Sequence, residues 1–439
     1  MQFTMKSYAV LSFMLLLVTG FSISVEAEPV KEVSVELNQE DIEPPMHISG
    51  NDELLQKAAE NDWPGTGTKE DPIVIQGYRF HSDMHMFTIS HTDLYVNFTN
   101  NWVEGMHHTW CALVISLTKN VIICNNTIFG GAIGVHLLAA NDSLVTRNTI
   151  YDSGFDAVFM DSGSTGNIIT DNYCYDNKET GVMGWTGSTQ NVVSNNLIID
   201  SDWGVAFRSG SNRNYVINNT IERTRISGVD LETTENEVRQ NLIYKTSGDG
   251  IRVFEADNLI SDNIIVEPEY RGIYLAPAAN RTTVLHNSMI NCTLESIFIM
   301  QSAKCIVRYN DFLGESEKPY AVDHGLLNVF EMNYWDGFLA IDENHDGVFD
   351  SAFEIGGNAQ NRDQYPVTSR NNPDQRAPVD EMVIEPDSTE MTTAESSTST
   401  TNGSGTAPTI SNASIELLVV GGGTGVLFVI LALIYYRRR

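Results

Sequence analysis

Eight side chains of this 439-residue sequence combine aromatic rings with charged groups, which suits sugar binding. A sugar ring stacks its apolar face on an aromatic ring, and its hydroxyls need hydrogen-bond donors and acceptors nearby. The candidate ligand-binding residues are Phe159, Trp185, Arg208, Asp230, Glu232, Arg252, Phe254 and Tyr274. The alternative is a solvated sheet face, on which ion pairs such as Asp230 with Arg252 join neighbouring strands and the aromatic rings are incidental.

Three carboxylates of the same region could take part in catalysis. Hydrolysis of a glycosidic bond needs two carboxyl groups about 5 to 10 Å apart. The candidates are Asp161, Asp230 and Glu232, of which the last two lie two residues apart and so on one strand face. The sequence has no Lys/Arg-rich pattern of the kind a polyuronate lyase uses, and a net charge of -31 argues against polyanionic substrates. Binding without catalysis is the preferred prediction.

An acidic loop near the C-terminal end has the spacing of an EF-hand-type calcium loop. Side-chain oxygens stand at positions 1, 3, 5 and 9, and a glycine stands at position 6 for the turn. The predicted ligands are Asp342, Asn344, Asp346, Val348 and Asp350. Position 12 is Phe353 instead of the bidentate Glu. Calcium is therefore the predicted cofactor, and an acidic turn without metal is the alternative.

A rival metal hypothesis rests on histidine and methionine residues, whose imidazole and thioether groups suit copper. These residues are His81, Met84, His85, Met86, His91, Met106, His107 and His108. Strand alternation sends Met84 and Met86 to the same side, where core packing explains both. No Met-x-x-Met or Cys-x-x-Cys motif accompanies them, so copper is the less favoured prediction.

A repeat of 22 to 25 residues must position all these side chains. Its first row consists of Asn101, Asn126, Asn148, Asn172, Asn196, Asn219, Asn241, Asn263, Asn287 and Asn310. A Gly-Val or Gly-Ile row and a second Asn row, five residues ahead of the first, keep the same period. Short alternating runs of Val and Ile without helical spacing predict three strands and three turns per repeat. The fold class is therefore all-β, a right-handed parallel β-helix of about ten coils.

The rows also predict which way the side chains point. Asn suits the turns because it tolerates left-handed backbone angles, and stacked amides can hydrogen-bond from coil to coil. Alternation after each glycine sends the Val or Ile inward and the next residue outward. This alternation places the eight candidate residues on one outward face.

The repeat divides the remaining chain into segments. We expect an N-terminal segment and cap at 28–78, with a helix N-capped at Asn51-Asp52 that covers the first coil. The β-helix itself is expected at 79–320, and an aromatic-rich C-terminal cap at 321–370. Residues 371–414 contain many Ser and Thr and predict an extended stalk.

The two ends of the chain predict its location. Residues 1–27 have the pattern of a secretory signal peptide, and 415–436 are apolar enough for one transmembrane helix. The arginines at 437–439 should form a cytoplasmic tail, with the β-helix outside the cell. The acidic charge excludes a nucleic-acid partner. Five cysteines leave open whether Cys111 and Cys124 form a disulfide or stay free.

Further motifs accompany the Asn and Gly rows. Trp63-Pro64-Gly65 leads into the segment 71–78, and Asn333-Tyr334-Trp335 is followed by the acidic loop and Tyr365-Pro366. Over residues 60–368 these motifs resemble the NosD-like and CASH-type right-handed β-helix repeat proteins, in their exported, membrane-anchored archaeal form. The resemblance implies the fold, and it implies copper-site maturation as a role of NosD-like members. Since such folds host binding proteins and enzymes alike, it does not decide the function.

The predicted function is recognition or adhesion at the cell surface, with extracellular glycans or cell-surface proteins as partners. The first alternative is a polysaccharide-processing enzyme, a hydrolase, lyase or epimerase, that uses the same outward face. The second alternative is a copper-handling protein of the NosD type.

Overall fold

The computed structural model describes residues 2–5, 33–36, 42–106, 108–314 and 319–372. The predicted transmembrane segment 415–436, the tail 437–439 and nearly all of the stalk and signal peptide lie outside these residues. Within the described part, no helix combines the length and the apolar character that a membrane crossing requires. Strands β1 (Gln2–Met5) and β2 (Val33–Glu36) form a small antiparallel pair.

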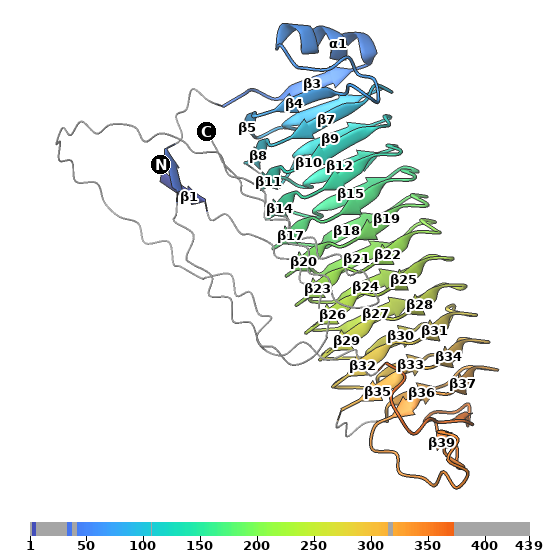
Figure 1. Cartoon of the computed structure of the whole chain (residues 1–439). Helices are drawn as coiled ribbons and strands as arrows, with labels where there is room; N and C mark the ends of the chain where they lie inside the picture. Colours follow the sequence, from blue (N-terminus) through green and yellow to red (C-terminus); the bar gives the residue numbers. More distant parts are fainter. Residues whose placement is uncertain (1, 6–32, 37–41, 107, 315–318, 373–439) are drawn as a thin grey trace, which may run out of the picture. The chain divides into compact units, whose positions relative to one another are not determined.

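The main body is a parallel β-helix of about eleven turns, built from three long sheets (Figure 1). Each turn contributes one strand to sheet I, then one to sheet II, then one to sheet III. Sheet I consists of β3 (Met46–Ser49), β6 (Phe87–Ser90), β9 (Leu113–Ser116), β12 (Val135–Leu138), β15 (Val158–Asp161), β18 (Thr180–Gly184), β21 (Trp203–Phe207), β24 (Ser227–Leu231), β27 (Asp249–Val253), β30 (Ile273–Leu275), β33 (Ile297–Ile299) and β36 (Ala321–Asp323).

Sheets II and III complete each turn. Sheet II consists of β4 (Ile73–Gln76), β7 (Val96–Thr99), β10 (Val121–Cys124), β13 (Leu144–Thr146), β16 (Ile168–Thr170), β19 (Val192–Ser194), β22 (Tyr215–Ile217), β25 (Glu237–Arg239), β28 (Leu259–Ser261), β31 (Thr283–Leu285), β34 (Ile306–Arg308), β37 (Val329–Glu331), β40 (Arg362–Asp363) and β39 (Phe353–Glu354). Sheet III consists of β5 (Arg79–Ser82), β8 (Trp102–Gly105), β11 (Thr127–Phe129), β14 (Thr149–Tyr151), β17 (Tyr173–Tyr175), β20 (Leu197–Ile199), β23 (Thr220–Glu222), β26 (Leu242–Tyr244), β29 (Ile264–Val266), β32 (Ser288–Ile290), β35 (Asp311–Leu313) and β38 (Tyr334–Trp335).

The parallel strands begin and end beyond the predicted β-helix segment 79–320. Strand β3 begins at Met46 and β38 ends at Trp335, so the predicted boundaries were too narrow. At the N-terminal end the coil lacks the asparagine signature, because Tyr78 stands one coil before Asn101 and donates its N–H to Oδ1 of Asn101 at 2.9 Å. At the C-terminal end the period of the repeat continues, because Ala321 pairs with Ile297 and Tyr334 pairs with Asp311 of the preceding coil.

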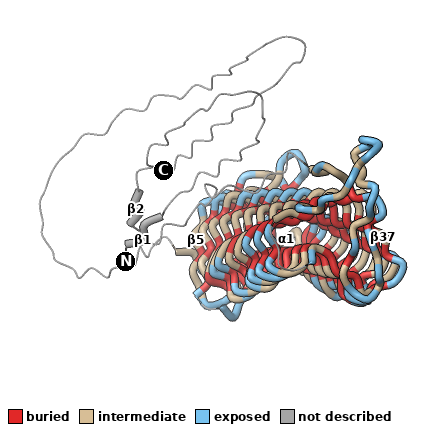
Figure 2. Tube along the Cα trace, turned by 90° about the horizontal axis from the view of Figure 1, so that it is seen from below, coloured by how far each residue is buried: buried red, intermediate tan, exposed pale blue. Residues whose placement is uncertain are grey.

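The inside of the coil is filled by aliphatic rows, as alternation predicts. The Val or Ile that follows each repeat glycine is fully buried, for example Val182, Val205 and Ile251. Figure 2, looking along the stack, shows buried positions continuing from coil to coil as unbroken rows. Each coil therefore rests on its neighbours through apolar contacts that repeat with the chain's period.

A buried row of asparagine amides joins the coils at the turn between sheets II and III. The N–H of Asn196 donates to Oδ1 of Asn219 at 3.0 Å, and Nδ2 of Asn196 donates to the same oxygen and to the carbonyl of Ile169. The pattern repeats from Asn101 to Asn333. The predicted hydrogen bonding from coil to coil is confirmed.

The left-handed backbone angle falls one residue earlier than predicted. The residues with positive φ are those immediately before the row, such as Asn195, Asn218 and Gln240. The buried asparagines themselves are absent from the positive-φ set, because their side chains must point inward to meet the amides of adjacent coils. The preceding position is more open and accepts several residue types, including Arg147.

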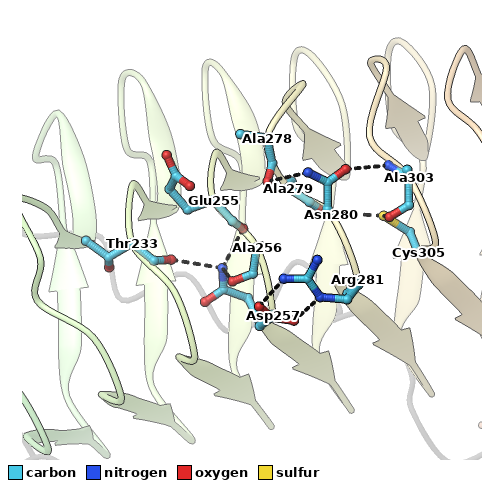
Figure 3. Close-up of polar contacts among 11 residues, drawn as sticks. Thr233, Glu255, Ala256, Asp257, Ala278, Ala279, Asn280, Arg281, Ala303 and Cys305 are labelled. Carbon is cyan, nitrogen blue, oxygen red and sulfur yellow. Dashed lines mark hydrogen bonds and ion pairs between the residues drawn. The ribbon is translucent and has the colours of Figure 1, made fainter.

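The second asparagine row lies at the turn between sheets I and II and is interrupted. It runs through Asn167, Asn191, Asn214, Asn236 and Asn258. Thr282 and Cys305 then occupy the next two positions. The sulfur of Cys305 lies 3.3 Å from the carbonyl oxygen of Ala279, and Nδ2 of Asn258 donates to the carbonyl of Thr233 at 2.9 Å (Figure 3). All five cysteines of the chain are free, so Cys111 and Cys124 are not paired.

Both ends of the apolar interior are closed. Helix α1 (Asn51–Glu60) lies at the N-terminal end of the stack and buries Leu54 and Ala58 in the core (Figure 1). Its N-cap is Gly50 and not Asn51, whose side chain instead binds Thr92 and Asp93 of the adjacent turn.

At the other end, a buried carboxylate terminates the first asparagine row. Oδ2 of Asp363 accepts hydrogen bonds from the N–H and Nδ2 of Asn333, at 3.0 and 2.9 Å, and from Nε1 of Trp335 at 3.1 Å. The last asparagine thus keeps an acceptor although no further coil follows it.

Replacing Asn219 with Leu should lower the free energy of unfolding by about 3 kcal/mol, because several buried hydrogen-bonding groups would lose their partners. The matched control is the adjacent, exposed Asn218, replaced by Gly, which tolerates its positive φ and should change stability by about 0.5 kcal/mol or less. Urea denaturation followed by circular dichroism measures both. Equal stability of the two variants would contradict the structural role of the amide row.

Candidate functional site

The outer face of sheet I carries the predicted row of outward residues in register. The aligned positions are His136, Phe159, Met183, Ala206, Asp230, Arg252, Tyr274 and Phe298. A neighbouring outward row lies two residues later in each coil and includes Trp185 and Arg208. The N–H of Trp185 donates to the carbonyl of Met160, and the N–H of Arg208 to that of Gly184. The coil-to-coil register therefore places all eight candidate ligand-binding residues in two adjacent rows of one surface.

Asp161 lies apart from the other candidate carboxylates. It belongs to β15, whereas Asp230 and Glu232 belong to β24 and the residue after it. Three strand spacings separate these coils, which is about 14 Å. Oδ1 of Asp161 accepts the N–H of the next residue, Ser162, at 2.6 Å. Asp161 is therefore too distant to act with Asp230 or Glu232 on one glycosidic bond.

Part of the outward row is covered, which alternation alone did not predict. Met183 and Ala206 are buried, and Asp230 is only 1% exposed. Asp230 lies between two arginines, with an oxygen 3.7 Å from Nη2 of Arg208 and the other 3.4 Å from Nη1 of Arg252. Nε of Arg208 also lies 3.2 Å from Oε1 of Glu232. Long side chains from adjacent coils thus close over the shorter ones.

A further row of polar side chains on this face was missed by the sequence analysis. It stands immediately before the repeat glycine, or before Ala157 and Ser296 at the equivalent positions, and comprises Asp156, Thr180, Trp203, Ser227, Asp249, Arg271 and Glu295. The guanidinium of Arg208 lies 4.4 Å above the ring of Trp203. Arg271 lies 3.6 Å from Asp249 and 3.3 Å from Glu295. The signal was available in the sequence, because this row keeps the period of the glycines.

The glycines explain why simple alternation failed there. A Cβ on Gly204 would lie 2.4 Å from Ile221, and one on Gly250 would lie 2.5 Å from Ile265, both on the inside of sheet III. The glycines therefore lie at a tight corner of the coil, where the backbone bends. Because of this bend, the side chain before the glycine can contact the outward rows of sheet I, as Trp203 contacts Arg208.

Several buried polar atoms on this face make no hydrogen bond within the described residues. They include Nε of Arg208, both carboxylate oxygens of Asp230, Nε1 of Trp203, Oγ of Ser227, Nε of Arg271 and Oε2 of Glu295. The charged atoms among them form ion pairs, but the distances or angles of these pairs lie outside the limits for a hydrogen bond.

Burial shifts the titration of two carboxyl groups on this face. It raises the pKa of Asp230 to about 6, against the opposing effect of the guanidiniums of Arg252 and Arg208. It raises the pKa of Asp156 to about 7, against the opposing hydrogen bond from Thr180. Both groups therefore change charge near neutral pH. A carboxyl group with such a pKa suits general acid or base catalysis as well as binding.

The aromatic rings of the face differ in how far they are free to stack. Arg252 lies 4.8 Å from the ring centre of Phe254, and Arg271 lies 5.2 Å from that of Tyr274. Phe159 stacks on His136 with ring centres 5.1 Å apart. Trp185 is 37% exposed and is the most open of these aromatic candidates. It is the ring best placed to stack on an incoming sugar.

The predicted calcium loop folds around its own acidic side chains. Oδ1 and Oδ2 of Asp342 accept the N–H groups of Asp346 and Gly347, at 3.2 and 3.1 Å. Oδ2 of Asp350 accepts the N–H of Glu343 at 2.9 Å. Val348 forms an antiparallel bridge to Val367, which ties the loop to the C-terminal segment. The described residues contain no group of three or more His, Cys, Asp or Glu side chains placed to hold a metal ion, so calcium stays a prediction.

The histidines and methionines of the copper hypothesis do not converge in the described structure. Nδ1 of His81 lies 3.1 Å from Glu104, and Nδ1 of His85 lies 3.2 Å from the carbonyl of Cys111. Met86 is buried and Met84 is exposed, so the prediction that both pack in the core was wrong for Met84. Residues 83–85 form a bend instead of a strand, which breaks the alternation. His107 lies outside the described residues.

The two best-formed hollows of the described structure lie away from the sugar-binding candidate. One hollow of about 490 Å³ lies at the turns between sheets I and II, lined by residues that include His91 and Lys119. Another of about 450 Å³ lies at the C-terminal cap beside His324 and Asn361. Neither includes any of the eight predicted ligand-binding residues. An extended face suits a polymer better than a small enclosed molecule.

Comparisons with known proteins agree on the fold. A family model described as "Periplasmic copper-binding protein (NosD)" matches residues 188–358, and one described as "Right handed beta helix region" matches residues 74–221. A comparison with curated proteins found no match.

Solved structures with a similar fold include the A-module of the mannuronan C-5 epimerase AlgE6 from Azotobacter vinelandii, at 13% identity and a TM-score of 0.42, covering 66% of this chain and 90% of that one. A mannuronic acid-specific polysaccharide family 6 lyase from human gut microbiota has 13% identity and a TM-score of 0.48, covering 66% and 86%. A mutant tailspike protein of the E. coli bacteriophage HK620, in complex with a hexasaccharide, has 12% identity and a TM-score of 0.45, covering 66% and 62%. At such identities these structures are similar in fold, and they do not assign a function.

The free energy of unfolding of the wild type should fall between pH 5 and pH 7.5. Replacing Asp156 with Asn should make this fall smaller. The pKa of Asp156 is about 7 in the folded protein, whereas an unfolded Asp has a pKa of about 3.9. The folded state therefore holds the proton more tightly, and the free energy of unfolding falls as pH rises through this range. Urea midpoints at both pH values measure the effect. Identical pH slopes for the wild type and the variant would contradict the raised pKa.

Adding about 5 mM calcium should raise the thermal midpoint of unfolding if the acidic loop binds the ion. The increase should disappear in Asp342→Asn, which weakens the predicted first ligand. It should persist in the control Asp52→Asn, an exposed residue of α1 at the opposite end of the stack. Absence of any calcium effect on the wild type would refute the predicted site.

Proposed function

Because the chain is a NosD-like right-handed β-helix repeat protein, we propose that the outer face of sheet I binds glycans and that the protein serves in extracellular recognition or adhesion. The observation that carries this proposal is the ion-paired cluster of Arg208, Asp230, Glu232 and Arg252 beside the exposed ring of Trp185. An aromatic platform next to fixed charges is the chemistry that a sugar ring and its hydroxyls require.

The charge balance of the face favours a neutral glycan. Three guanidiniums, those of Arg208, Arg252 and Arg271, are matched by carboxylates on the same rows, including Glu232 and Glu295. No positive charge is left in excess to neutralise an acidic polymer, and the whole chain carries a net charge of -31. The proposed ligand is therefore a polysaccharide or glycoconjugate without carboxylate or sulfate groups.

The proposed location is the cell surface. The argument is the sequence pattern of the ends, with a secretory signal at 1–27 and a single span at 415–436, followed by three arginines. In this arrangement the β-helix lies outside the cell on a Ser/Thr-rich stalk. Glycans and the surface proteins that carry them are the molecules it would meet there.

A polysaccharide-processing activity is the second candidate function, and one observation favours it. The carboxyl group of Asp230 has a pKa of about 6 because it is buried, and it lies between two arginines on the proposed binding face. Such a group can exchange a proton at neutral pH, and Glu232 approaches the same Arg208. Asp230 and Glu232 are therefore the residues to test for catalysis.

Trp185→Ala should weaken retention of the full-length protein on a neutral polysaccharide matrix by about 10-fold or more, because one sugar-stacking ring is lost. The matched control is Tyr365→Ala, which removes an exposed ring from the C-terminal cap and should bind like the wild type. Affinity electrophoresis against a panel of neutral and acidic polysaccharides measures both variants. Equal retention of the two variants would refute the proposed binding face.

Mass spectrometry of the polysaccharides after incubation separates binding from catalysis. The proposal expects unchanged polymers. Shortened or epimerised products that disappear with Asp230→Asn, while Trp185-dependent retention persists, would establish the enzyme alternative instead.

A further inference from the structure

Several asparagines of the described residues stand in the pattern Asn-x-Ser/Thr, which is the acceptor motif for N-linked glycans in exported proteins. They are Asn97, Asn125, Asn141, Asn218, Asn280 and Asn291. The motif alone is weak evidence in a chain so rich in asparagine. The fold supplies two further criteria, because a glycan on the folded protein must project into solvent, and it must do so from an amide nitrogen that is free to carry it.

Exposure divides these asparagines into two groups. Asn97, Asn125 and Asn280 are only partly exposed. Asn97 lies within β7, and its Oδ1 is buried. Asn280 is held on both sides, since its Oδ1 accepts the N–H of Ala303 at 2.7 Å and its Nδ2 donates to the carbonyl of Ala278 at 3.4 Å (Figure 3). These three positions therefore lack the open surroundings that an attached sugar needs.

The amide nitrogen separates the exposed asparagines from one another. Nδ2 of Asn218 donates to Oδ1 of Asn195 at 2.6 Å, and a sugar on this nitrogen would add bulk at the contact. Among the described residues, Nδ2 of Asn141 and Nδ2 of Asn291 have no hydrogen-bond partner. Asn141 and Asn291 alone therefore meet both criteria within the described part of the chain.

The hydrogen bonding of Asn141 uses its oxygen and leaves its nitrogen free. Oδ1 of Asn141 accepts the N–H of Thr165 in the next coil at 2.9 Å. Because the oxygen and the nitrogen diverge from the same carbon, Nδ2 points away from this contact. N-glycosylation changes only the nitrogen, so the oxygen stays an acceptor and the bond to Thr165 survives. Asn141 can therefore carry a sugar and keep its structural role.

Space for a first sugar is present beside Asn141. The hollow of about 490 Å³ at the turns between sheets I and II is lined by Asn141 itself, with Leu117 and Lys119. Leu117 is 53% exposed and provides an apolar wall, and the ammonium group of Lys119 provides a donor. A sugar ring has an apolar face and a hydroxyl rim that match such a lining.

Asn291 has a similar arrangement at the turn between β32 and β33. A Cβ on Gly314 of the next coil would lie 2.2 Å from Oδ1 of Asn291, so the amide oxygen faces that coil. Asn291 and Thr293, the first and third residues of the motif, are both exposed. The φ of 52° at Asn291 is a turn conformation that asparagine tolerates.

We propose that Asn141 and Asn291 carry N-linked glycans and that Asn97, Asn125 and Asn280 do not. The proposal rests on the extracellular location proposed above, because this modification belongs to exported chains. Asn141 follows β12 at the turn to sheet II, and Asn291 precedes β33 at the turn from sheet III. Both attachment points therefore lie outside the outward rows of sheet I, where the proposed binding face is.

The modification is a glycosyl transfer from a glycosyl phosphate donor of the host. A bond forms between Nδ2 and the anomeric carbon of the sugar. The bond from that carbon to the phosphate oxygen breaks, Nδ2 gives up one proton, and the phosphate leaves with the electron pair. No oxidant or reductant is needed.

Mass spectrometry of proteolytic peptides from the full-length protein, isolated from its native host, tests the proposal. Peptides with Asn141 or Asn291 should carry sugar in more than half of the copies. Asn141→Asp and Asn291→Asp keep an acceptor oxygen and remove the nitrogen, so each variant should lose one glycan and the double variant both. Thr293→Ala should lose the glycan at Asn291 although the asparagine remains. Urea midpoints close to that of the wild type would show that the variants fold.

The partly exposed asparagines Asn97, Asn125 and Asn280 are internal controls in the same digest and should be unmodified. Unmodified Asn141 and Asn291 in the wild type would overturn the proposal. Modification of the controls to the same extent as Asn141 would also overturn it, because the fold would then not select the sites. Labelling of intact cells with a membrane-impermeant reagent reports the location separately, and retention on polysaccharides through Trp185 reports the binding face. Failure of one proposal is thus distinguishable from failure of the other.

Discussion

The buried asparagine row is the constraint on which the rest of the structure depends. At the turn between sheets II and III the backbone changes direction inside an apolar stack, where unpaired N–H and C=O groups are costly. Each amide, such as that of Asn219, accepts from a backbone N–H of the preceding coil and donates to one carbonyl of that coil and one of its own, so adjacent coils cannot slide past each other. Asp363 ends the row with a carboxylate in place of an amide.

Because the register between coils is fixed, residues that recur with the repeat form continuous rows on the surface of the coil. Residues 22 to 25 positions apart in the chain become neighbours about 4.8 Å apart, so Arg208, Asp230 and Arg252 meet although no local motif joins them. Burial raises the pKa of the Asp230 carboxyl group to about 6, although the guanidiniums of Arg252 and Arg208 act in the opposite direction. The same geometry that makes the face suitable for glycan hydroxyls also gives it a group able to move a proton.

Each of the three sheets has its own surface character. Sheet I presents charged and aromatic side chains, sheet II presents uncharged rows from Val74 to Ile217 and ion pairs such as Arg239 with Glu237 beyond them, and sheet III packs some of its outer apolar residues into a local cluster. A solenoid can carry these differences without conflict, because the inward rows alone determine the core and the outward rows are free to vary.

The sequence by itself determined the fold and the direction of most side chains. Periodic rows of Asn and Gly-Val predicted the parallel β-helix, the coil-to-coil hydrogen bonds and the outward row from His136 to Phe298, because each follows from strand alternation and a constant repeat. The row before the glycines was missed, since the bend at Gly204 and its equivalents departs from strict alternation. Only the tertiary structure decided the burial of Asp230 and the exposure of Met84. These depend on which long side chains of adjacent coils cover a position and on where a strand gives way to a bend, and the spacing of residues along one chain does not contain that information.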